Sequence, residues 1–325
     1  MTVTRQVRIV SADELRVMVR YEDLIEPISQ AFQESSARRA ENGLIVMFPA
    51  ESPKLGDVYV KTGVLRGHAV FVVKISSWFA ANIISGEAQG GFVAVFDSRT
   101  GHTLAILNDE HYLSDIRTAA AGALAARVFA PKRVKTAAVL GSGVQAYWQS
   151  LALYHERRYD RLLIWARNTE KAAVLARRLA PAMPAVQIEV ADELETAVRA
   201  AEVVITATLS REPILRGAWL RPGQHVTAVG ADDPTKCELD AEALHRARVF
   251  VDSVETATAN GDVHRAILSG TYKPDEIAGE IGDVLAGRLA GRFSPSEITI
   301  AKFVGIGAQD LAAAETAVGK LTNGP

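Results

Sequence analysis

The sequence predicts an α/β protein with two domains, an α+β domain and a larger domain built on a parallel sheet. The chain has 325 residues, which is long for a single hydrophobic core. Its first third contains alternating apolar and polar runs, the pattern of antiparallel hairpins. After about residue 125, short apolar runs alternate with helical segments, the pattern of a parallel sheet with crossover helices.

The first third is expected to hold one long helix and two hairpins. Helical spacing of apolar residues covers 15–40. The predicted strands are 57–65 and 69–76, joined by a turn at 66–68, and the two halves of 92–107, joined by a turn at 98–101. An Ala-rich helix at 117–130 follows and ends before Pro131.

The remainder of the chain alternates strands with helices. The predicted strands are short and almost wholly apolar, as parallel strands covered on both faces are. They are 134–140, 161–166, QIEVA, EVVITAT, HVTAVG, RVFVDS and ITIAKFVG. A last helix at 309–320 is expected to return to the first domain. The predicted domains are therefore 1–125 plus 306–325, and 126–305.

Composition excludes several classes of function. The 36 basic and 38 acidic residues give a formal charge of -2 without long runs of either sign, which argues against nucleic-acid and membrane-surface binding. The single cysteine, Cys237, allows no intrachain disulfide, and no apolar run approaches the ~20 residues of a membrane span. The expectation is a cytoplasmic protein. The seven histidines show no metal-ligand spacing, and no metal site is predicted.

Two glycines follow the strand 134–140 and precede a helix, in the segment AAVLGSGVQA. Gly141 would permit a tight turn, and Gly143 would let the backbone approach a pyrophosphate at the helix N-terminus. Ala146 stands where a third glycine is usual and still permits close packing of helix on sheet. A purely structural turn is the alternative, but the alternating strands and helices downstream favour a Rossmann-type dinucleotide-binding domain.

The end of the second predicted strand bears on the choice of cofactor. Sites for a ribose 2′-hydroxyl usually carry an acid there, whereas sites for a 2′-phosphate favour Arg. This chain has Arg167, with no acid before Glu170. NADP(H) is therefore the preferred cofactor, with NAD(H) as the alternative if Arg167 only begins a surface helix. The residues predicted to bind the cofactor are Gly141, Ser142, Gly143, Val144, Gln145, Ala166, Arg167, Asn168, Thr206, Ala207, Thr208, Val229 and Gly230.

Four segments together resemble the ornithine cyclodeaminase/mu-crystallin family: VVKISSWFAAN, YLSDIRTAAAGALAA, GSGVQA and VGADDPTKCELD. The tail KFVGIGAQDLAAA is similar to the family's terminal segment, and the likeness is greatest to the bacterial branch labelled ornithine cyclodeaminase or ectoine-utilisation protein. The resemblance implies a homodimer of two-domain subunits, each with a substrate-binding and dimerisation domain. The family includes cyclodeaminases, amino-acid dehydrogenases, imine reductases and a hormone-binding protein, so fold alone does not settle the reaction.

The resemblance also assigns roles to three residues. Lys74 and Arg117 match positions that bind the substrate carboxylate, and Lys74 is also predicted to be catalytic. Asp232 matches the acid beside the reacting amine, where it could accept or donate the proton on nitrogen. The alternatives are an exposed strand residue for Lys74, a helix-surface charge for Arg117 and a turn or cap residue for Asp232. The match with the family favours Asp232 over the adjacent Asp233.

One departure from the family concerns a third carboxylate contact. The family usually has an Arg upstream of the Lys, but residues 45–54 contain none. Lys61 or Arg66 could substitute, and Lys61 is the predicted substrate-binding residue.

Three functions of different classes follow from these observations. The first is nicotinamide-dependent hydride transfer at the Cα–N bond of a small amino or imino acid, as an imine reductase or amino-acid dehydrogenase. The second is an ornithine-type cyclodeaminase, which would use NAD+ without net redox change and release ammonia. The third is a non-enzymatic ligand-binding protein, which the joint presence of Lys74, Arg117 and Asp232 argues against.

Overall fold

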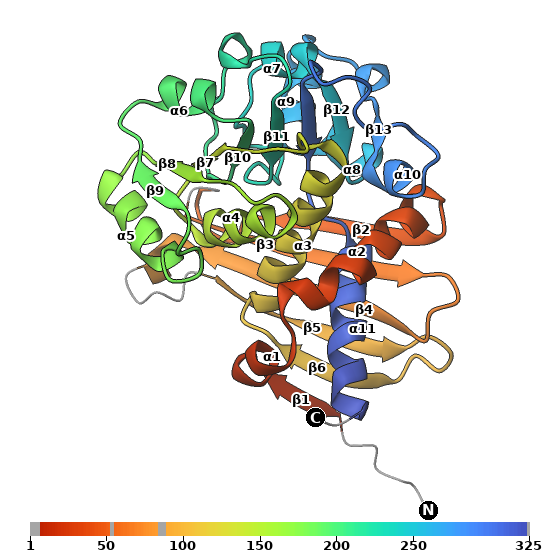
Figure 1. The fold of residues 1–325 in the computed structure, drawn as a ribbon. Helices are drawn as coiled ribbons and strands as arrows, with labels where there is room; N and C mark the ends of the chain where they lie inside the picture. Colours follow the sequence, from red (N-terminus) through yellow and green to blue (C-terminus); the bar gives the residue numbers. More distant parts are fainter. Residues whose placement is uncertain (1–6, 53–54, 84–88, 324–325) are drawn as a thin grey trace, which may run out of the picture. The chain divides into compact units, whose positions relative to one another are not determined.

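The computed structural model describes residues 7–52, 55–83 and 89–323 (Figure 1). The chain divides into two compact units: unit 1 comprises Met1–Arg117 with Ile306–Pro325, and unit 2 comprises Thr118–Gly305. The division lies within the helix α3 (Tyr112–Phe129), whereas the sequence placed it near residue 125. The second part of α3 belongs to unit 2 because the Thr118 carbonyl accepts a hydrogen bond from Gln149 and Ala126 packs in a core cluster of that unit.

Unit 1 is built on a mixed sheet. Over the described residues this sheet has six strands in the order β1-β6-β5-β4-β3-β2, with β1 parallel to β6 and the other pairs antiparallel. The strands are β1 (Arg8–Ser11), β2 (Ala40–Met47), β3 (Gly56–Leu65), β4 (Val70–Phe79), β5 (Gln89–Asp97) and β6 (Thr103–Asn108). The helices are α1 (Ala12–Met18), α2 (Tyr21–Ser36), a 3-10 turn (Ala80–Ile83) and α11 (Gly307–Asn323).

The predicted helix over 15–40 is two helices followed by a strand. Ser11 caps α1 through a capping box with Glu14, which moves the start of that helix upstream. The backbone is extended at Val19 and Arg20, which separates α1 from α2. The edge strands β1 and β2 were not predicted, and both carry exposed apolar side chains that blur the alternation of a half-buried strand.

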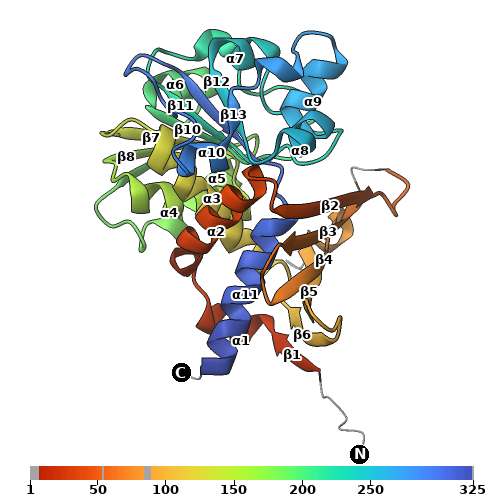
Figure 2. The same ribbon diagram turned by 90° about the vertical axis from the view of Figure 1, so that its right-hand side faces the viewer.

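The last helix returns to unit 1, where it packs against α2 and the sheet (Figure 2). The first residue of this helix lies so close to β3 that neither element has room for a side chain where they touch. A Cβ on Gly63 would lie 2.1 Å from the Gly307 carbonyl oxygen, and a Cβ on Gly307 would lie 1.8 Å from that of Thr62. Asn42 Oδ1 accepts the Ala308 N–H at 2.8 Å, which fixes the helix start to β2 as well.

Unit 2 is a doubly wound α/β domain. Its described residues form an eight-stranded, wholly parallel sheet in the order β13-β12-β14-β11-β10-β7-β8-β9. The strands are β7 (Thr136–Leu140), β8 (Arg161–Trp165), β9 (Gln187–Val190), β10 (Val203–Thr206), β11 (His225–Ala228), β12 (Arg248–Val251), β13 (Gly279–Glu280) and β14 (Thr299–Lys302). Strand order reverses at β7, where β8 lies on one side and β10 on the other, and such reversals are where this fold binds ligands.

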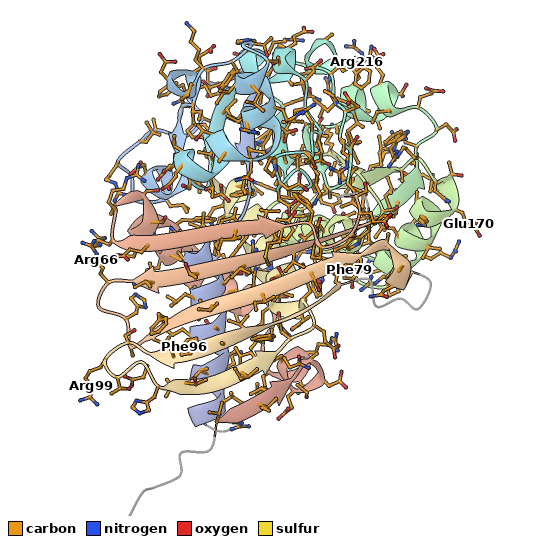
Figure 3. All side chains as sticks on the ribbon, turned by 180° about the vertical axis from the view of Figure 1, so that it is seen from behind. Arg66, Phe79, Phe96, Arg99, Glu170 and Arg216 are labelled. Carbon is orange, nitrogen blue, oxygen red and sulfur yellow. The ribbon has the colours of Figure 1, made fainter. Side chains whose placement is uncertain are left out.

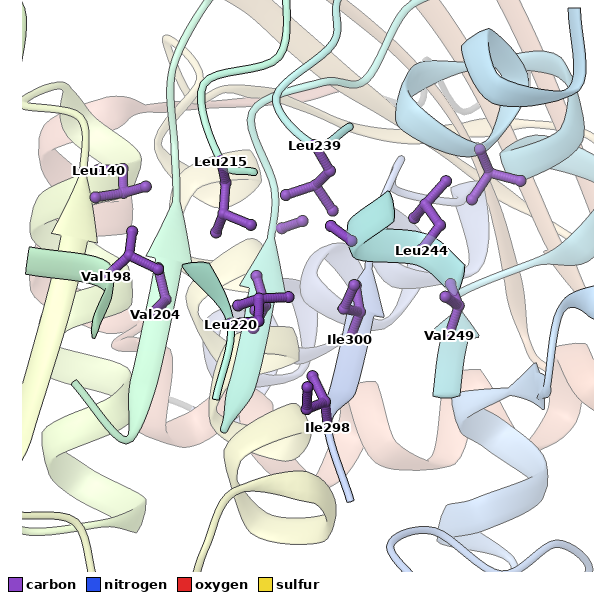
Figure 4. Close-up of a cluster of buried hydrophobic side chains, with 14 of the residues drawn as sticks. Leu140, Val198, Val204, Leu215, Leu220, Leu239, Leu244, Val249, Ile298 and Ile300 are labelled. Atoms are coloured by element: carbon purple, nitrogen blue, oxygen red, sulfur yellow. The ribbon is translucent and has the colours of Figure 1, made fainter. Parts of the chain in front are cut away.

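Helices and short 3-10 turns connect these strands. The helices are α4 (Val144–Glu156), α5 (Thr169–Leu179), α6 (Leu194–Ala200), α7 (Ala241–Arg246), α8 (Val254–Ala259), α9 (Gly261–Leu268) and α10 (Ile281–Leu285), and the 3-10 turns are Gly217–Trp219 and Pro274–Glu276. Alternate residues of β7 enter two different core clusters, Ala138 and Leu140 in one (Figure 4) and Ala137 and Val139 in the other. The sheet is therefore covered on both faces, as its apolar strands predicted.

None of the helices in the described part of the chain is long and apolar enough to cross a membrane. Within the same residues, no group of three or more His, Cys, Asp and Glu side chains is arranged to hold a metal ion.

Candidate functional site

The turn after β7 contains two glycines whose surroundings differ. Gly141 has φ 135°, and a Cβ there would lie 2.3 Å from the Ala207 carbonyl oxygen, so the turn itself demands glycine. Gly143 is the N-cap of α4, has no side-chain cap, and a Cβ there would meet nothing within 4 Å. Because the fold does not need glycine at 143, the open space before the N–H groups of α4 favours a bound anion over a purely structural turn.

In the turn that follows β8, the two adjacent polar residues predicted to bind the cofactor have different roles. The Asn168 side chain caps α5, accepting the Lys171 N–H at 3.0 Å. Arg167 is exposed directly after the strand, and Glu170 points outward from the first turn of α5 (Figure 3). The exposed cation directly after β8 is therefore Arg167.

The predicted residues at the ends of β10 and β11 are held by an acid that the sequence interpretation missed. Glu238 is buried and accepts hydrogen bonds from the hydroxyls of Thr206 at 2.7 Å and Thr208 at 2.8 Å. It also accepts the Thr208 N–H at 2.6 Å and the Gly230 N–H at 2.9 Å. Both threonine hydroxyls thus point to an internal carboxylate, and these strand ends present mainly backbone to a ligand.

The loop after β11 distinguishes its two adjacent aspartates. Asp233 is buried, and its Oδ1 accepts the N–H groups of Thr235 and Lys236, which makes it the turn-forming residue. The Asp232 side chain keeps 35% of its surface exposed, and its Oδ1 accepts a 2.7 Å hydrogen bond from Lys236 Nζ. Asp232 is therefore the more accessible of the two acids, and it forms an ion pair with the buried Lys236.

Unit 1 holds a second site, a buried cluster of cations. Lys61 and Lys74 lie directly opposite each other on β3 and β4, and both are more than 95% buried. Lys74 Nζ donates to Ser114 Oγ at 2.9 Å and to Asp310 Oδ1 at 2.7 Å, and Arg117 Nε donates to the same oxygen at 3.1 Å. The exposed alternatives for Lys74 and Arg117 are thus excluded by burial. We call Lys61, Lys74, Arg117 and Asp310 the cationic cluster.

The cations of the cationic cluster act together on Asp310. Burial alone would raise the pKa of Asp310, but Lys74, Arg117 and Lys61 together lower it to about 2. Another acid near Lys74 is Asp109, whose pKa is raised by burial. Burial, opposed by Asp310, lowers the pKa of Lys74. Like charges opposite each other on neighbouring strands are destabilising, so this arrangement favours a further anion.

Of the two candidates for the missing N-terminal Arg, Lys61 lies in the cationic cluster and Arg66 does not. Arg66 lies at the tip of the β3–β4 hairpin (Figure 3), where it is exposed and lies 3.6 Å from Glu41. Lys61 is buried, and its charge helps to lower the pKa of Asp310. The segment that lacks the Arg is described except at residues 53–54, which lie outside the described residues. Asp310, Ser114, Lys236 and Glu238 were not predicted from the sequence.

The model of the ornithine cyclodeaminase/mu-crystallin family matches residues 5–324. The chain belongs to this family. It is 37% identical over 313 residues to an uncharacterized cyclodeaminase, y4tK, of Sinorhizobium fredii, covering 95% of this chain and 94% of that protein.

Two solved structures are similar along almost their whole length. The Thermococcus litoralis Delta(1)-pyrroline-2-carboxylate reductase in complex with NADH and L-proline has a TM-score of 0.91 at 26% identity, covering 98% of both chains. An archaeal alanine dehydrogenase dimer with bound NAD has a TM-score of 0.89 at 26% identity, covering 96% of this chain and 95% of that one. The predicted family, fold class and enzyme class, and the reaction class of hydride transfer at a Cα–N bond, are confirmed.

Proposed function

We propose that this family member reduces the C=N bond of a small α-imino acid to the α-amino acid, preferring NADPH to NADH, as a homodimer. The observation that carries the proposal is the cationic cluster, in which three buried cations gather around the one carboxylate of Asp310. Arg117 offers a planar fork for that carboxylate, and Lys61 and Lys74 offer point charges from the sheet. A binding site for one carboxylate is what an α-imino acid requires.

Residues of unit 2 would provide the remaining chemistry. The glycine turn and the first turn of α4 would hold the cofactor pyrophosphate, and the bound cofactor supplies the hydride. Asp232, which Lys236 holds by a hydrogen bond, would stabilise the protonated imine nitrogen. In the reverse direction the same carboxylate would accept a proton from the ammonium group of the amino acid.

The preference for NADPH rests on Arg167. It is the exposed cation after β8, and the Asn168 side chain beside it is committed to capping α5. The similar structures hold NADH and NAD, so their cofactors do not themselves support this preference. An Arg at this position pairs with a 2′-phosphate, whereas an NAD site usually has an acid there.

The decisive experiment follows the loss of reduced-nicotinamide absorbance with NADPH and NADH in parallel. The substrates are Δ1-pyrroline-2-carboxylate, Δ1-piperideine-2-carboxylate and the imines that pyruvate forms with ammonia or methylamine. We expect turnover that is faster with NADPH, and Arg167→Ala is expected to lower the NADPH-to-NADH ratio of kcat/KM by about tenfold. A ratio unchanged by Arg167→Ala would contradict the role of Arg167, and no turnover with any imine would contradict the reductase.

The second candidate function is cyclodeamination, which the 37% identity to a protein named as a cyclodeaminase favours. It predicts ammonia release from ornithine, a cyclic imino-acid product and no net change in cofactor absorbance. The same Asp232 would serve, by accepting the proton of the reacting amine. An ammonia assay on ornithine and lysine with NAD+ separates this function from the reductase.

The homodimer is supported by the archaeal alanine dehydrogenase, which was solved as a dimer. Light scattering after size exclusion tests it, and a monomeric mass would contradict it.

A further inference from the structure

Beyond the last paired residues of β10 and β11, the two strand ends are joined by a side chain. The ladder between these strands ends at Thr206 and Ala228. The next in-register pair on the same faces is Thr208 and Gly230, and the Glu238 carboxylate accepts one N–H from each, at 2.6 and 2.9 Å. Glu238 therefore extends the connection between the strands by two residues, at the carboxyl edge of the sheet.

The approach at this point is close enough to exclude any side chain. A Cβ on Gly230 would lie 2.3 Å from the Thr208 carbonyl oxygen and 2.5 Å from Glu238 Oε1. The groups around the Glu238 carboxylate that are described above are all donors, the two N–H groups and the hydroxyls of Thr206 and Thr208. A carboxylate can accept from all of them, whereas an amide would turn its NH2 group toward donors.

Glu238 is fixed in turn by a buried ion pair. Asp262 Oδ1 accepts the N–H groups of Glu238 and Leu239, and its Oδ2 lies 3.2 Å from Lys302 Nζ. Lys302 is fully buried and donates to the Ala231 carbonyl oxygen. The loop that carries Asp232 is consequently held at both ends, before it through Ala231 and after it through Glu238. We call Glu238, Asp262 and Lys302 the acid network.

We infer that Glu238 is a positioning residue that sets the cofactor-facing ends of β10 and β11 and the Asp232 loop together. The inference rests on the proposed function only where it gives Asp232 a role in the reaction. The effect of Glu238 on the ends of β10 and β11 does not depend on which substrate the protein uses. Glu238 touches neither substrate nor cofactor in this account, and it acts through Thr208, Gly230 and the loop that follows. A fold-stabilising role alone would leave cofactor affinity unchanged in the folded variant.

The test is Glu238→Gln, with Glu280→Gln as the matched control. Glu280 is also buried in unit 2 and accepts a backbone N–H, that of Val254 at 3.0 Å, but it lies at the β13 edge of the sheet. The dissociation constants of NADPH and NADH are measured by fluorescence without substrate, together with Tm. Glu238→Gln is expected to raise the dissociation constants of NADPH and NADH by about tenfold and to lower kcat. Glu280→Gln is expected to change the two dissociation constants and kcat by less than about twofold.

Equal cofactor affinity in folded Glu238→Gln and the parent would overturn the inference. If Glu238→Gln does not fold, Thr206→Val removes one donor to Glu238 while preserving side-chain shape, and a loss of about threefold in cofactor affinity is expected. No change in that variant would then overturn the inference. Because binding is measured without an imine, failure of the proposed reaction would leave this result intact and distinguishable.

Discussion

Two buried carboxylates, one in each unit, have pKa values shifted in opposite directions. Burial would raise both, yet the pKa of Asp310 is lowered to about 2 while that of Glu238 is raised to about 7. Asp310 lies among Lys74, Arg117 and Lys61, whereas Glu238 shares one cation, Lys302, with a second acid, Asp262. The difference teaches that, between two carboxylates that burial affects in the same direction, the neighbouring charges decide which way the pKa finally moves.

The same difference separates what the two regions can bind. The cationic cluster brings three buried cations to one carboxylate, so it favours an anion from outside. In the acid network, the Glu238 carboxylate instead accepts four hydrogen bonds from its own chain. One region is suited to recognition, and the other is suited to holding backbone in place.

The largest expected effect comes from removing a cation of the cluster. Lys74→Met is expected to reduce kcat/KM for the imino acid by about a thousandfold. The substitution removes a buried amine and leaves its hydrogen-bond partners, including the Asp310 carboxylate, without that donor. Cofactor affinity, which depends on unit 2, is expected to stay within about twofold of the parent. Steady-state kinetics and fluorescence titration of NADH check both. A parallel loss of cofactor affinity would show that the two regions are not separable.

Acid titration of stability tests the low pKa of Asp310. Its folded pKa, about 2, lies below the ordinary value of 3.8, so its ionisation stabilises the fold above about pH 4, and this contribution is lost as the pH falls toward 2. The contribution is about 2 to 3 kcal/mol. Urea unfolding of Asp310→Asn and the parent should therefore differ most at neutral pH and converge toward pH 3. A difference in unfolding free energy between the variant and the parent that stays constant with pH would contradict the lowered pKa of Asp310.

Lys61 and Arg66 form a natural pair for comparing a buried and an exposed cation near one another in sequence. Lys61→Met is expected to raise the KM for the imino acid by about tenfold, since one of three cations around the carboxylate is lost. Arg66→Met is expected to change it by less than about twofold, because exposed pairs contribute little. Equal effects would remove Lys61 from the site.

The smallest expected effect concerns Glu238 and pH. Because the Glu238 pKa is raised to about 7 by burial and Asp262, against Lys302, its carboxylate gains a proton as the pH falls from 8 to 6. A protonated acid cannot accept all of its present hydrogen bonds, so NADH affinity is expected to fall a few-fold over this interval. NADH is preferable because the 2′-phosphate of NADPH titrates in the same range. In Glu238→Gln the pH dependence of NADH affinity should disappear. If it persists, another titrating group causes it.

Much of the fold and part of the site followed from local patterns and the family resemblance. Glycines at 141 and 143 and the short apolar strands predicted unit 2, and the blocks around Lys74 and Arg117 predicted two cations that the structure brings to one oxygen of Asp310. The partner Asp310 could not be predicted, because it joins them across 236 and 193 residues of sequence. The only local signal was its place in the terminal segment GAQD.

The acid network was missed for a different reason. Its members, Glu238, Asp262 and Lys302, are of residue types that usually lie on the protein surface. A single sequence does not distinguish a buried charge from a solvated one. Glu238 follows Asp232 within the segment VGADDPTKCELD, so the loop as a unit was the detectable feature. Likewise, β2 was hidden because its alternate side chains are only partly buried.

The return of α11 to unit 1 imposes an order on the synthesis of the protein. All of Thr118–Gly305 leaves the ribosome before Gly307–Asn323 does, so unit 2 can fold while the cationic cluster still lacks Asp310. Until that helix emerges, Lys61, Lys74 and Arg117 have no Asp310 to offset their repulsion. Completion of the cationic cluster therefore awaits the last helix to be translated.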